Sequence, residues 1–183
     1  MFASRSHRPM FLLIAALTAS VALTGCKKQP RGLVRKPYLQ SMTADSVIVA
    51  WQTATDERGI IKFGQSNAPG QSVTESKSRK DHNILLTGLK TGGKYFYRVW
   101  NSNGAVSQVY SFTTAPAAKN ANFTFVAIGD SGSGSSEQKK IARLLEQEQF
   151  DFWVHTGDLV YDAGASKDFQ AKFFDPYAAI LSE

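Results

Sequence analysis

Cysteine is nearly absent from the 183 residues of the sequence, since Cys26 is the only one. A lone thiol excludes a framework of disulfide bonds within the chain. Long apolar runs are also lacking: a membrane-spanning helix takes ~20 apolar residues, and the run from Phe11 to Val21 is much shorter. The chain is therefore neither a disulfide-stapled domain nor anchored by a helix made from that run.

Acidic residues are scarce in the first part of the chain. Cys26 to Asn120 contains 14 basic and 5 acidic residues, whereas Ala121 to Glu183 contains 5 basic and 10 acidic ones. No interleaving of aromatic residues with arginine accompanies the basic charge, so we expect no nucleic-acid partner. The acidic second part disfavours an anionic substrate unless a bound metal ion supplies positive charge.

The first 25 residues have the features of an export signal. Arg5 and Arg8 precede the apolar run, and small residues follow it. Cys26 ends the stretch Leu23-Thr24-Gly25-Cys26, which resembles the lipobox of bacterial lipoproteins. The resemblance implies a signal peptide over 1–25, lipidation at Cys26 and an exported protein anchored to a bacterial membrane. Because Lys27 and not an aspartate follows, the outer membrane or cell surface is favoured. A plain signal peptide with a chance cysteine is the alternative.

A polar tether over 26–34 leads into residues with a two-residue apolar period. Val47, Val49 and Trp51 fall on one face of such a run, and this pattern is typical of half-buried strands. Short strands separated by Gly, Asn and Ser clusters predict an antiparallel β-sandwich over 35–116. The expected strands are 46–53, 60–64, 83–89, 94–101 and 106–113.

The stretch LTGLKTGGKYFYRVW makes the prediction of a sandwich more specific. It resembles a fibronectin type III domain at the corner where a leucine closes one strand and a tyrosine six residues later opens the next. Leu89 and Tyr95 occupy those positions, and Thr91 stands where proline is usual. The tyrosine hydroxyl is expected to fold back over the corner.

The pattern changes after the linker over 115–120. Apolar runs at Phe123 to Ile128 and Phe150 to Thr156 flank a segment with helical periodicity. Ser135 and Gln138 predict a capping box, and Ile141, Leu144 and Leu145 predict an apolar stripe. Strand, helix and strand form a βαβ unit, whose two strands are expected to be parallel.

Both of these predicted strands end in Gly-Asp, at 129–130 and 157–158. Ligands of parallel sheets bind beyond the carboxyl ends of strands, and neighbouring strands lie ~4.8 Å apart. Asp130 and Asp158 should therefore converge. Two such close carboxylates repel each other unless a cation lies between them, and their oxygens suit hard metal ions. Tyr161 follows closely enough to bind the same ion if that ion is strongly Lewis-acidic, such as ferric iron.

AIGDSG and HTGDLVYD resemble the first two metal motifs of purple acid phosphatases, a branch of the calcineurin-like metallophosphoesterases. KPYLQ and SFTTAP resemble the ends of the fibronectin-like domain that precedes the catalytic domain in many members. The resemblance implies that 121–183 is the first part of the α/β metallophosphoesterase domain. It also implies a binuclear centre of iron with iron, zinc or manganese. Asp130 and Tyr161 would bind the ferric-type ion, Asp158 would bridge both ions, and a hydroxide held by the two metals would hydrolyse phosphomonoesters.

The family's later metal motifs, GNH[DE], a further histidine and GH-x-H, do not occur in the sequence. Of the three histidines, His7 is in the predicted signal, His82 is on a predicted sandwich strand, and His155 more often has a structural role at such a place. Asp168 to Glu183 resembles the helix that precedes the GNH[DE] block. We therefore expect an incomplete centre and an inactive 183-residue chain, truncated after the second metal motif.

Other functions fit the sequence less well. A GDS-type esterase with Ser131 as nucleophile explains the strand-serine-helix order but not the second Gly-Asp or Tyr161. A protease needs a suitable upstream histidine, and neither His7 in the predicted signal nor His82 on a predicted sandwich strand is one. The loop has neither the glycine spacing nor the lysine of a nucleotide site. Asp130 and Asp158 also suit ordinary turns. A surface-tethered sandwich that binds a partner without catalysis is the alternative from another functional class.

Overall fold

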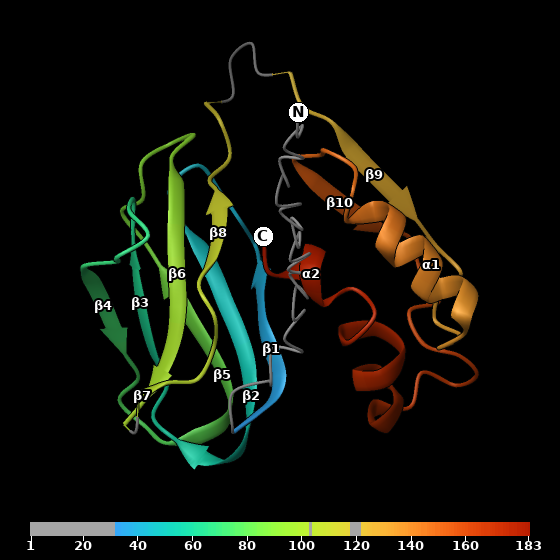
Figure 1. Ribbon diagram of the computed structural model, residues 1–183, viewed down its shortest axis with the longest axis horizontal. Helices are drawn as coiled ribbons and strands as arrows, with labels where there is room; N and C mark the ends of the chain where they lie inside the picture. Colours follow the sequence, from blue (N-terminus) through green and yellow to red (C-terminus); the bar gives the residue numbers. More distant parts are fainter. Residues whose placement is uncertain (1–31, 103, 118–121) are drawn as a thin grey trace, which may run out of the picture.

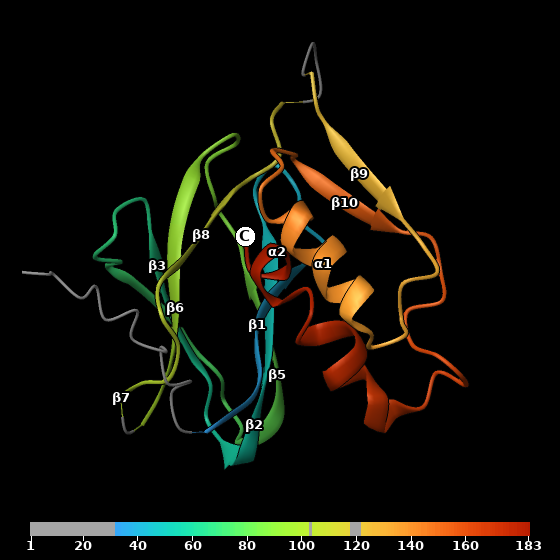
Figure 2. The same cartoon turned by 45° about the vertical axis from the view of Figure 1, so that its right-hand side comes forward.

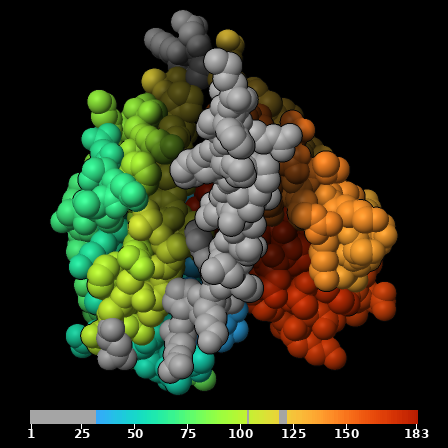
Figure 3. All heavy atoms as spheres, viewed as in Figure 1, coloured from blue at the N-terminus to red at the C-terminus, as the bar shows by residue number. Residues whose placement is uncertain are grey.

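The structure is a computed structural model that describes residues 32–102, 104–117 and 122–183. The predicted signal peptide 1–25, the lipidation site Cys26 and all but the last residues of the predicted tether lie outside these ranges. The described residues form two lobes, the sandwich in blue to yellow and the C-terminal lobe in orange to red (Figures 1 and 3). No helix within the described ranges is long and apolar enough to cross a bilayer.

The first lobe is the predicted antiparallel β-sandwich. One sheet has the order β1-β2-β5, and the other has the order β4-β3-β6-β7, with β8 also paired to β6. The strands are β1 (Leu33–Gln40), β2 (Val47–Glu57), β3 (Ile60–Gly64), β4 (Gln71–Thr74), β5 (Arg79–Leu86), β6 (Lys94–Asn101), β7 (Gly104–Ala105) and β8 (Tyr110–Thr113). The predicted bounds of β3 and β6 are confirmed.

Strand β1 differs from the sequence-based expectation, because it begins at Leu33, within the range predicted as tether. Its residues do not alternate cleanly between apolar and polar, and its pairing with β2 shifts register twice, between Leu33 and Arg35 and again before Tyr38. The strand therefore depends on hydrogen bonds to β2 more than on its own apolar pattern.

The core of the sandwich follows the two-residue period. Val47 and Val49 are fully buried and Trp51 is 2% exposed. At the predicted corner the Tyr95 hydroxyl accepts a hydrogen bond from the backbone N–H of Lys90 at 2.8 Å, and Leu89 is buried beside it. The tyrosine corner inferred from the sequence is thus present.

The second lobe contains the predicted βαβ unit. Strands β9 (Phe125–Ile128) and β10 (Phe152–His155) are parallel, and helix α1 (Ser136–Leu145) connects them. The side chain of Ser135 caps the helix by accepting the Gln138 N–H. In a capping box the Gln138 side chain would accept the N–H of Ser135. Here its Oε1 instead accepts the N–H of Gly134 at 2.6 Å.

The predicted apolar stripe of α1 was partly wrong. Leu145 is buried, but Ile141 is 44% exposed and Leu144 is 60% exposed. The buried face instead consists of Gln138, Ala142 and Leu145. Gln138 can be buried because its side-chain amide forms hydrogen bonds with the backbone of Gly134 and Lys172. On the opposite face of the two-stranded sheet, Phe123, Phe125, Phe152 and Val154 are also exposed. The C-terminal lobe therefore presents apolar surface on two sides.

The expected single helix over 168–183 is also wrong. The chain forms three short turns: η1 (Ser166–Asp168), the π-helix η2 (Gln170–Phe174) and α2 (Ala178–Leu181). Pro176 lies between the last two, where it cannot donate the backbone hydrogen bond of a continuous helix. These turns run back to the sandwich, where α2 lies beside β1 (Figures 1 and 2) and the Tyr97 hydroxyl donates to the Ser182 carbonyl at 2.9 Å.

Candidate metal centre

The two Gly-Asp pairs lie side by side at the carboxyl ends of β9 and β10. The strands pair in register up to His155 and Ile128, and the loops that follow remain joined. The Asp130 N–H donates to the Gly157 carbonyl at 3.2 Å, and the Gly132 N–H donates to the Asp158 carbonyl at 3.1 Å. The two strand ends therefore converge, as the parallel pairing predicts.

Both aspartates have left-handed backbone conformations, with φ of 53° at Asp130 and 54° at Asp158. Such conformations cost roughly 1–3 kcal/mol each for a residue other than glycine and are concentrated at functional sites. Gly157, before the second aspartate, has φ of 134°, which needs glycine. The turn geometry is therefore similar at both strand ends and directs two exposed carboxylates to one place.

Tyr161 joins the two carboxylates. Its hydroxyl lies 2.9 Å from Oδ1 of Asp130 and 2.6 Å from Oδ2 of Asp158. The phenol has one proton to donate, so the two carboxylates share it. The three side chains predicted as metal ligands thus meet around a single oxygen atom.

The pKa of Tyr161 is raised well above its ordinary value of 10.0. The hydrogen bond to Asp158 is the largest cause, and the hydrogen bond to Asp130 comes next, because both stabilise the protonated phenol. A multivalent cation among the three oxygens has the opposite effect, since it would attract both carboxylates and the phenolate. The donor set therefore fits one hard, Lewis-acidic metal ion in place of the shared proton.

The part of the chain that the structure describes contains no cluster of the usual metal-ligating side chains. No group of three or more His, Cys, Asp or Glu side chains there is arranged to hold a metal. Metal sites normally use four to six donors, so the three oxygens of Asp130, Asp158 and Tyr161 are fewer than such a site normally uses.

Ser131 and His155 form a contact that the sequence did not predict. Oγ of Ser131 lies 2.8 Å from Nε2 of His155, and Nδ1 of the same ring accepts the Gly157 N–H at 3.3 Å. A neutral imidazole whose Nδ1 accepts has its proton on Nε2. His155 then donates to Ser131 and cannot act as its general base in this arrangement.

The surroundings of His155 agree with a structural role. Burial lowers its pKa, and the neighbouring carboxylates of Asp130 and Asp158 offset part of that effect. The neutral ring packs edge-on against Trp153 and Phe173. Ser131 itself is only 9% exposed, so the geometry does not favour an esterase with this serine as nucleophile.

Lys172, which the sequence analysis did not single out, is linked to both metal-motif loops, directly to the loop after β10 and through Gln138 to the loop after β9. Its ammonium group donates to the Tyr161 carbonyl and lies 3.6 Å from Oδ2 of Asp168. Its own carbonyl accepts a hydrogen bond from Nε2 of Gln138 at 2.6 Å. No local pattern in the sequence marks this lysine, because its partners come from α1 and from the loop after β10.

The fold and the site can now be compared with known proteins. Residues 36–114 match the family described as "Purple acid Phosphatase, N-terminal domain". The solved structure of PhoD resembles 85% of this chain with a TM-score of 0.62 and 16% sequence identity, which is a similarity of fold alone. The chain spans 38% of the length of that PhoD structure.

A fibronectin type III domain derived from a human protein also matches, with 17% identity, a TM-score of 0.37, and coverage of 51% of this chain and 80% of that one. The comparison with curated proteins finds no significant match. The predicted order of a fibronectin-like sandwich followed by the first βαβ part of an α/β domain is thus supported by the family match and by the fold of PhoD.

Proposed function

We propose that the chain is part of a metal-dependent phosphoesterase that acts on phosphate monoesters, because residues 36–114 match the family model of the purple acid phosphatase N-terminal domain. The substrate class, the metal ions and the roles of individual residues are part of this proposal. The chain matches less than half of the PhoD structure's length, so the proposal concerns the whole enzyme to which these two lobes would belong.

One observation carries the proposal: the hydroxyl of Tyr161 contacts the carboxylates of both Asp130 and Asp158. A turn or cap needs only one of these carboxylates. Two carboxylates and a phenol that converge at the ends of parallel strands are instead suited to a hard cation. In this proposal Asp130 and Tyr161 would hold a ferric-type ion, and Asp158 would help to hold both ions of the binuclear centre.

A bound cation would supply positive charge that attracts a phosphate ester and acidifies a water molecule. The residues of this chain would hold the ion and support the loops that carry its ligands. The left-handed turns at Asp130 and Asp158 bring both carboxylates to the Tyr161 hydroxyl, and all three oxygens would hold the ion. His155 and Ser131 support the loop between these ligands through their mutual hydrogen bond.

The proposal includes a limit on the activity of the 183 residues themselves. The described residues bring together three oxygen donors, fewer than a metal site normally uses. They contain no group of three or more His, Cys, Asp or Glu side chains that could hold an ion. We expect weak binding of one ion and no hydrolysis of an aryl phosphate above the buffer rate with added iron, zinc or manganese. Turnover well above that rate would contradict this limit.

Metal binding tests the site more directly. Ferric citrate would be titrated into the protein, and the visible absorption band of a ferric phenolate would be followed. Tyr161→Phe should abolish the band and Asp158→Asn should weaken it, whereas Asp56→Asn, a matched change at an exposed aspartate of the sandwich, should leave it unchanged. A band that persists in Tyr161→Phe would refute the assignment of this residue as ligand.

We also propose that the protein is exported and anchored to a bacterial membrane through a lipid on Cys26, which brings the phosphoesterase to the cell envelope. The support is the lipobox-like Leu23-Thr24-Gly25-Cys26 after an apolar run. Incorporation of a labelled fatty acid in wild type but not in Cys26→Ser checks this. Equal labelling of both proteins would exclude Cys26.

A further inference from the structure

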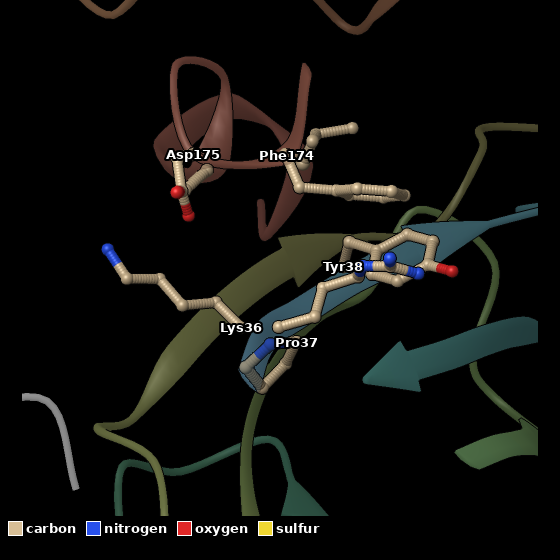
Figure 4. Close-up of a pocket in the computed structure, with 8 residues that line it drawn as sticks. Lys36, Pro37, Tyr38, Phe174 and Asp175 are labelled. Atoms are coloured by element: carbon tan, nitrogen blue, oxygen red, sulfur yellow. The ribbon is translucent and has the colours of Figure 1, made fainter. Parts of the chain in front are cut away.

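The sandwich has no chemistry of its own in the proposed function, yet it holds the segment that supports the candidate metal centre. The contact is formed by β1 and by η2, which are separated by more than 120 residues in the sequence. The guanidinium carbon of Arg35 lies 3.7 Å from the centroid of the Phe174 ring, and the ring centroids of Tyr38 and Phe174 are 5.1 Å apart. Figure 4 shows the Phe174 ring projecting from its helix toward Tyr38.

A polar contact fixes the other end of the same short helix. Nε of Arg35 donates to Oε1 of Gln170 at 3.2 Å, and Nε2 of Gln170 donates to Oδ1 of Asp175 at 2.8 Å. Arg35 therefore binds the first and the last residue of η2. A five-residue π-helix has little stability of its own, so its position depends on its neighbours. On one side these are Arg35 and Tyr38 of β1. On the other, Phe173 packs against Trp153 and Tyr177 of the second lobe.

Lys172 lies in the middle of η2 and connects this helix to the loops of the candidate site by hydrogen bonds. Its carbonyl accepts from Gln138, whose Oε1 in turn accepts the N–H of Gly134 in the loop after Asp130. Its ammonium group donates to the carbonyl of Tyr161. One lysine is thus linked through Gln138 to the loop of the first Gly-Asp and directly to the loop of the second.

We infer that β1 of the sandwich, through Phe174 and Lys172, holds the two metal-motif loops in register, and that the N-terminal domain is therefore a positioning element for the carboxylate pair and Tyr161. This inference rests on the proposed function for its relevance to metal binding, but the coupling itself exists without a metal. Lys172 and Phe174 are positioning residues, since neither side chain contacts the three converging oxygens in the described structure.

Backbone hydrogen exchange on the full chain tests the coupling without metal. The Gly132 N–H donates to the Asp158 carbonyl, and the Tyr161 N–H donates to the Gly132 carbonyl at 2.8 Å, so these two amides report on the register of the loops. Phe174→Ala and Lys172→Met should each accelerate their exchange by ~10-fold or more, because local opening then costs less free energy. Amides of β2 and β6 should not change, which also verifies that the sandwich remains folded.

Matched variants separate positioning from a general loss of stability. Lys172→Arg keeps a donor at the end of a long stem and should restore most of the protection, whereas Lys167→Met removes an exposed lysine nearby and should have no effect. Arg35→Met removes the contact from the side of the sandwich and should accelerate the same two amides, with the exposed Arg58→Met as its control. Unchanged exchange at Gly132 and Tyr161 in Phe174→Ala, Lys172→Met and Arg35→Met would overturn the inference.

The ferric phenolate titration distinguishes the two proposals. If both the coupling and the metal site are correct, Phe174→Ala binds ferric iron more weakly than wild type. Lys172→Met also binds it more weakly, and Lys172→Arg restores most of the affinity. If wild type binds no iron while the exchange rates respond as expected, the proposed function fails and the coupling stands. If iron binds equally to every variant and exchange is unchanged, the coupling fails and the metal site stands.

Discussion

The hydroxyl of Tyr161 lies 2.6 Å from Oδ2 of Asp158, three residues earlier in the chain. The same hydroxyl reaches Asp130, which is 31 residues away in sequence, at 2.9 Å. A short local contact and a long-range contact therefore end on one oxygen atom. This arrangement makes the ionisation of Tyr161 a sensitive report of whether the two strand ends remain together.

We predict that Asp158→Asn lowers the pKa of Tyr161 toward its ordinary value, because the hydrogen bond to Asp158 is the largest cause of the raised pKa. Nuclear magnetic resonance of a tyrosine-ring label, followed as a function of pH, measures this change. The control variant Asp56→Asn, on the sandwich, should not affect the resonance. An unaltered Tyr161 titration in Asp158→Asn would show that the contact is not formed in solution.

Alkaline pH should destabilise the protein through Tyr97. Burial raises the pKa of this tyrosine well above 10.0, with Tyr110 and Glu183 as smaller causes. In the unfolded chain a tyrosine ionises near pH ~10, so above that pH the unfolded state binds fewer protons and the free energy of unfolding falls. The stabilising contribution is complete below the unfolded pKa and is lost as the pH rises through the folded one.

Denaturant unfolding between pH 8 and pH 11 tests whether the free energy of unfolding falls as the pH rises. Tyr97→Phe should make the alkaline decrease shallower, and it should also reduce stability at pH 8 by about 1–2 kcal/mol, because the buried Ser182 carbonyl loses its donor. The partly exposed Tyr38 provides a control through Tyr38→Phe. Parallel pH profiles for wild type and Tyr97→Phe would contradict the assignment.

Ser131 should not react as a nucleophile. Its hydroxyl accepts from His155, and the side chain is buried. Incubation with an organophosphorus reagent that labels activated serines should therefore produce no adduct at this residue by mass spectrometry. An adduct that disappears in Ser131→Ala would instead support the esterase alternative.

Gly132→Ala should separate the two metal-motif loops. A Cβ at this position would overlap the backbone of Leu159 and Val160, which has no freedom to move away cheaply. Overpacking of this kind costs about 1–3 kcal/mol, and it should appear as faster exchange of the Tyr161 amide. Gly70→Ala is the matched control, since a Cβ there has no neighbour within 4 Å. Equal protection of Tyr161 in both variants would count against close packing of the loops.

The exposed aromatic face of the C-terminal lobe should promote self-association. The rings of Phe125 and Phe152 stack at 5.5 Å, and the two side chains are 52% and 46% exposed. Phe152→Ser should reduce the binding of an apolar dye and slow aggregation, because it interrupts this contiguous surface. Phe112→Ser, at a residue that is 3% exposed in the sandwich, should instead unfold its lobe. Unchanged aggregation in Phe152→Ser would exclude this face as the cause.

Much of the fold could be predicted because it depends on short-range patterns. The two-residue period around Trp51 specifies a strand with one buried face, and the spacing from Leu89 to Tyr95 specifies the corner. Features whose partners lie elsewhere in the chain were less predictable. Strand β1 lacks a clean alternation and exists because β2 lies beside it, and Ile141 and Leu144 have the helical period but no covering element among the described residues.

The candidate site likewise has features that could be predicted from the sequence and features that could not. The repeated Gly-Asp and the tyrosine three residues later were visible in the sequence, since parallel strands necessarily bring their carboxyl ends to one edge. The contact of Ser131 with His155 and the role of Lys172 were not visible. A serine, a histidine or a lysine in isolation has no periodicity, and each of these acquires its partner only when the chain folds.

The sequence by itself determined the order of the elements and the place where three oxygen donors would meet, because backbone periodicity and strand direction are local properties. Only the tertiary structure decided that Phe174 would pack against Arg35 and Tyr38 and that Lys172 would link both loops. Those contacts join residues far apart in the chain, and their existence depends on the balance of burial, hydrogen bonding and loop entropy over the whole molecule.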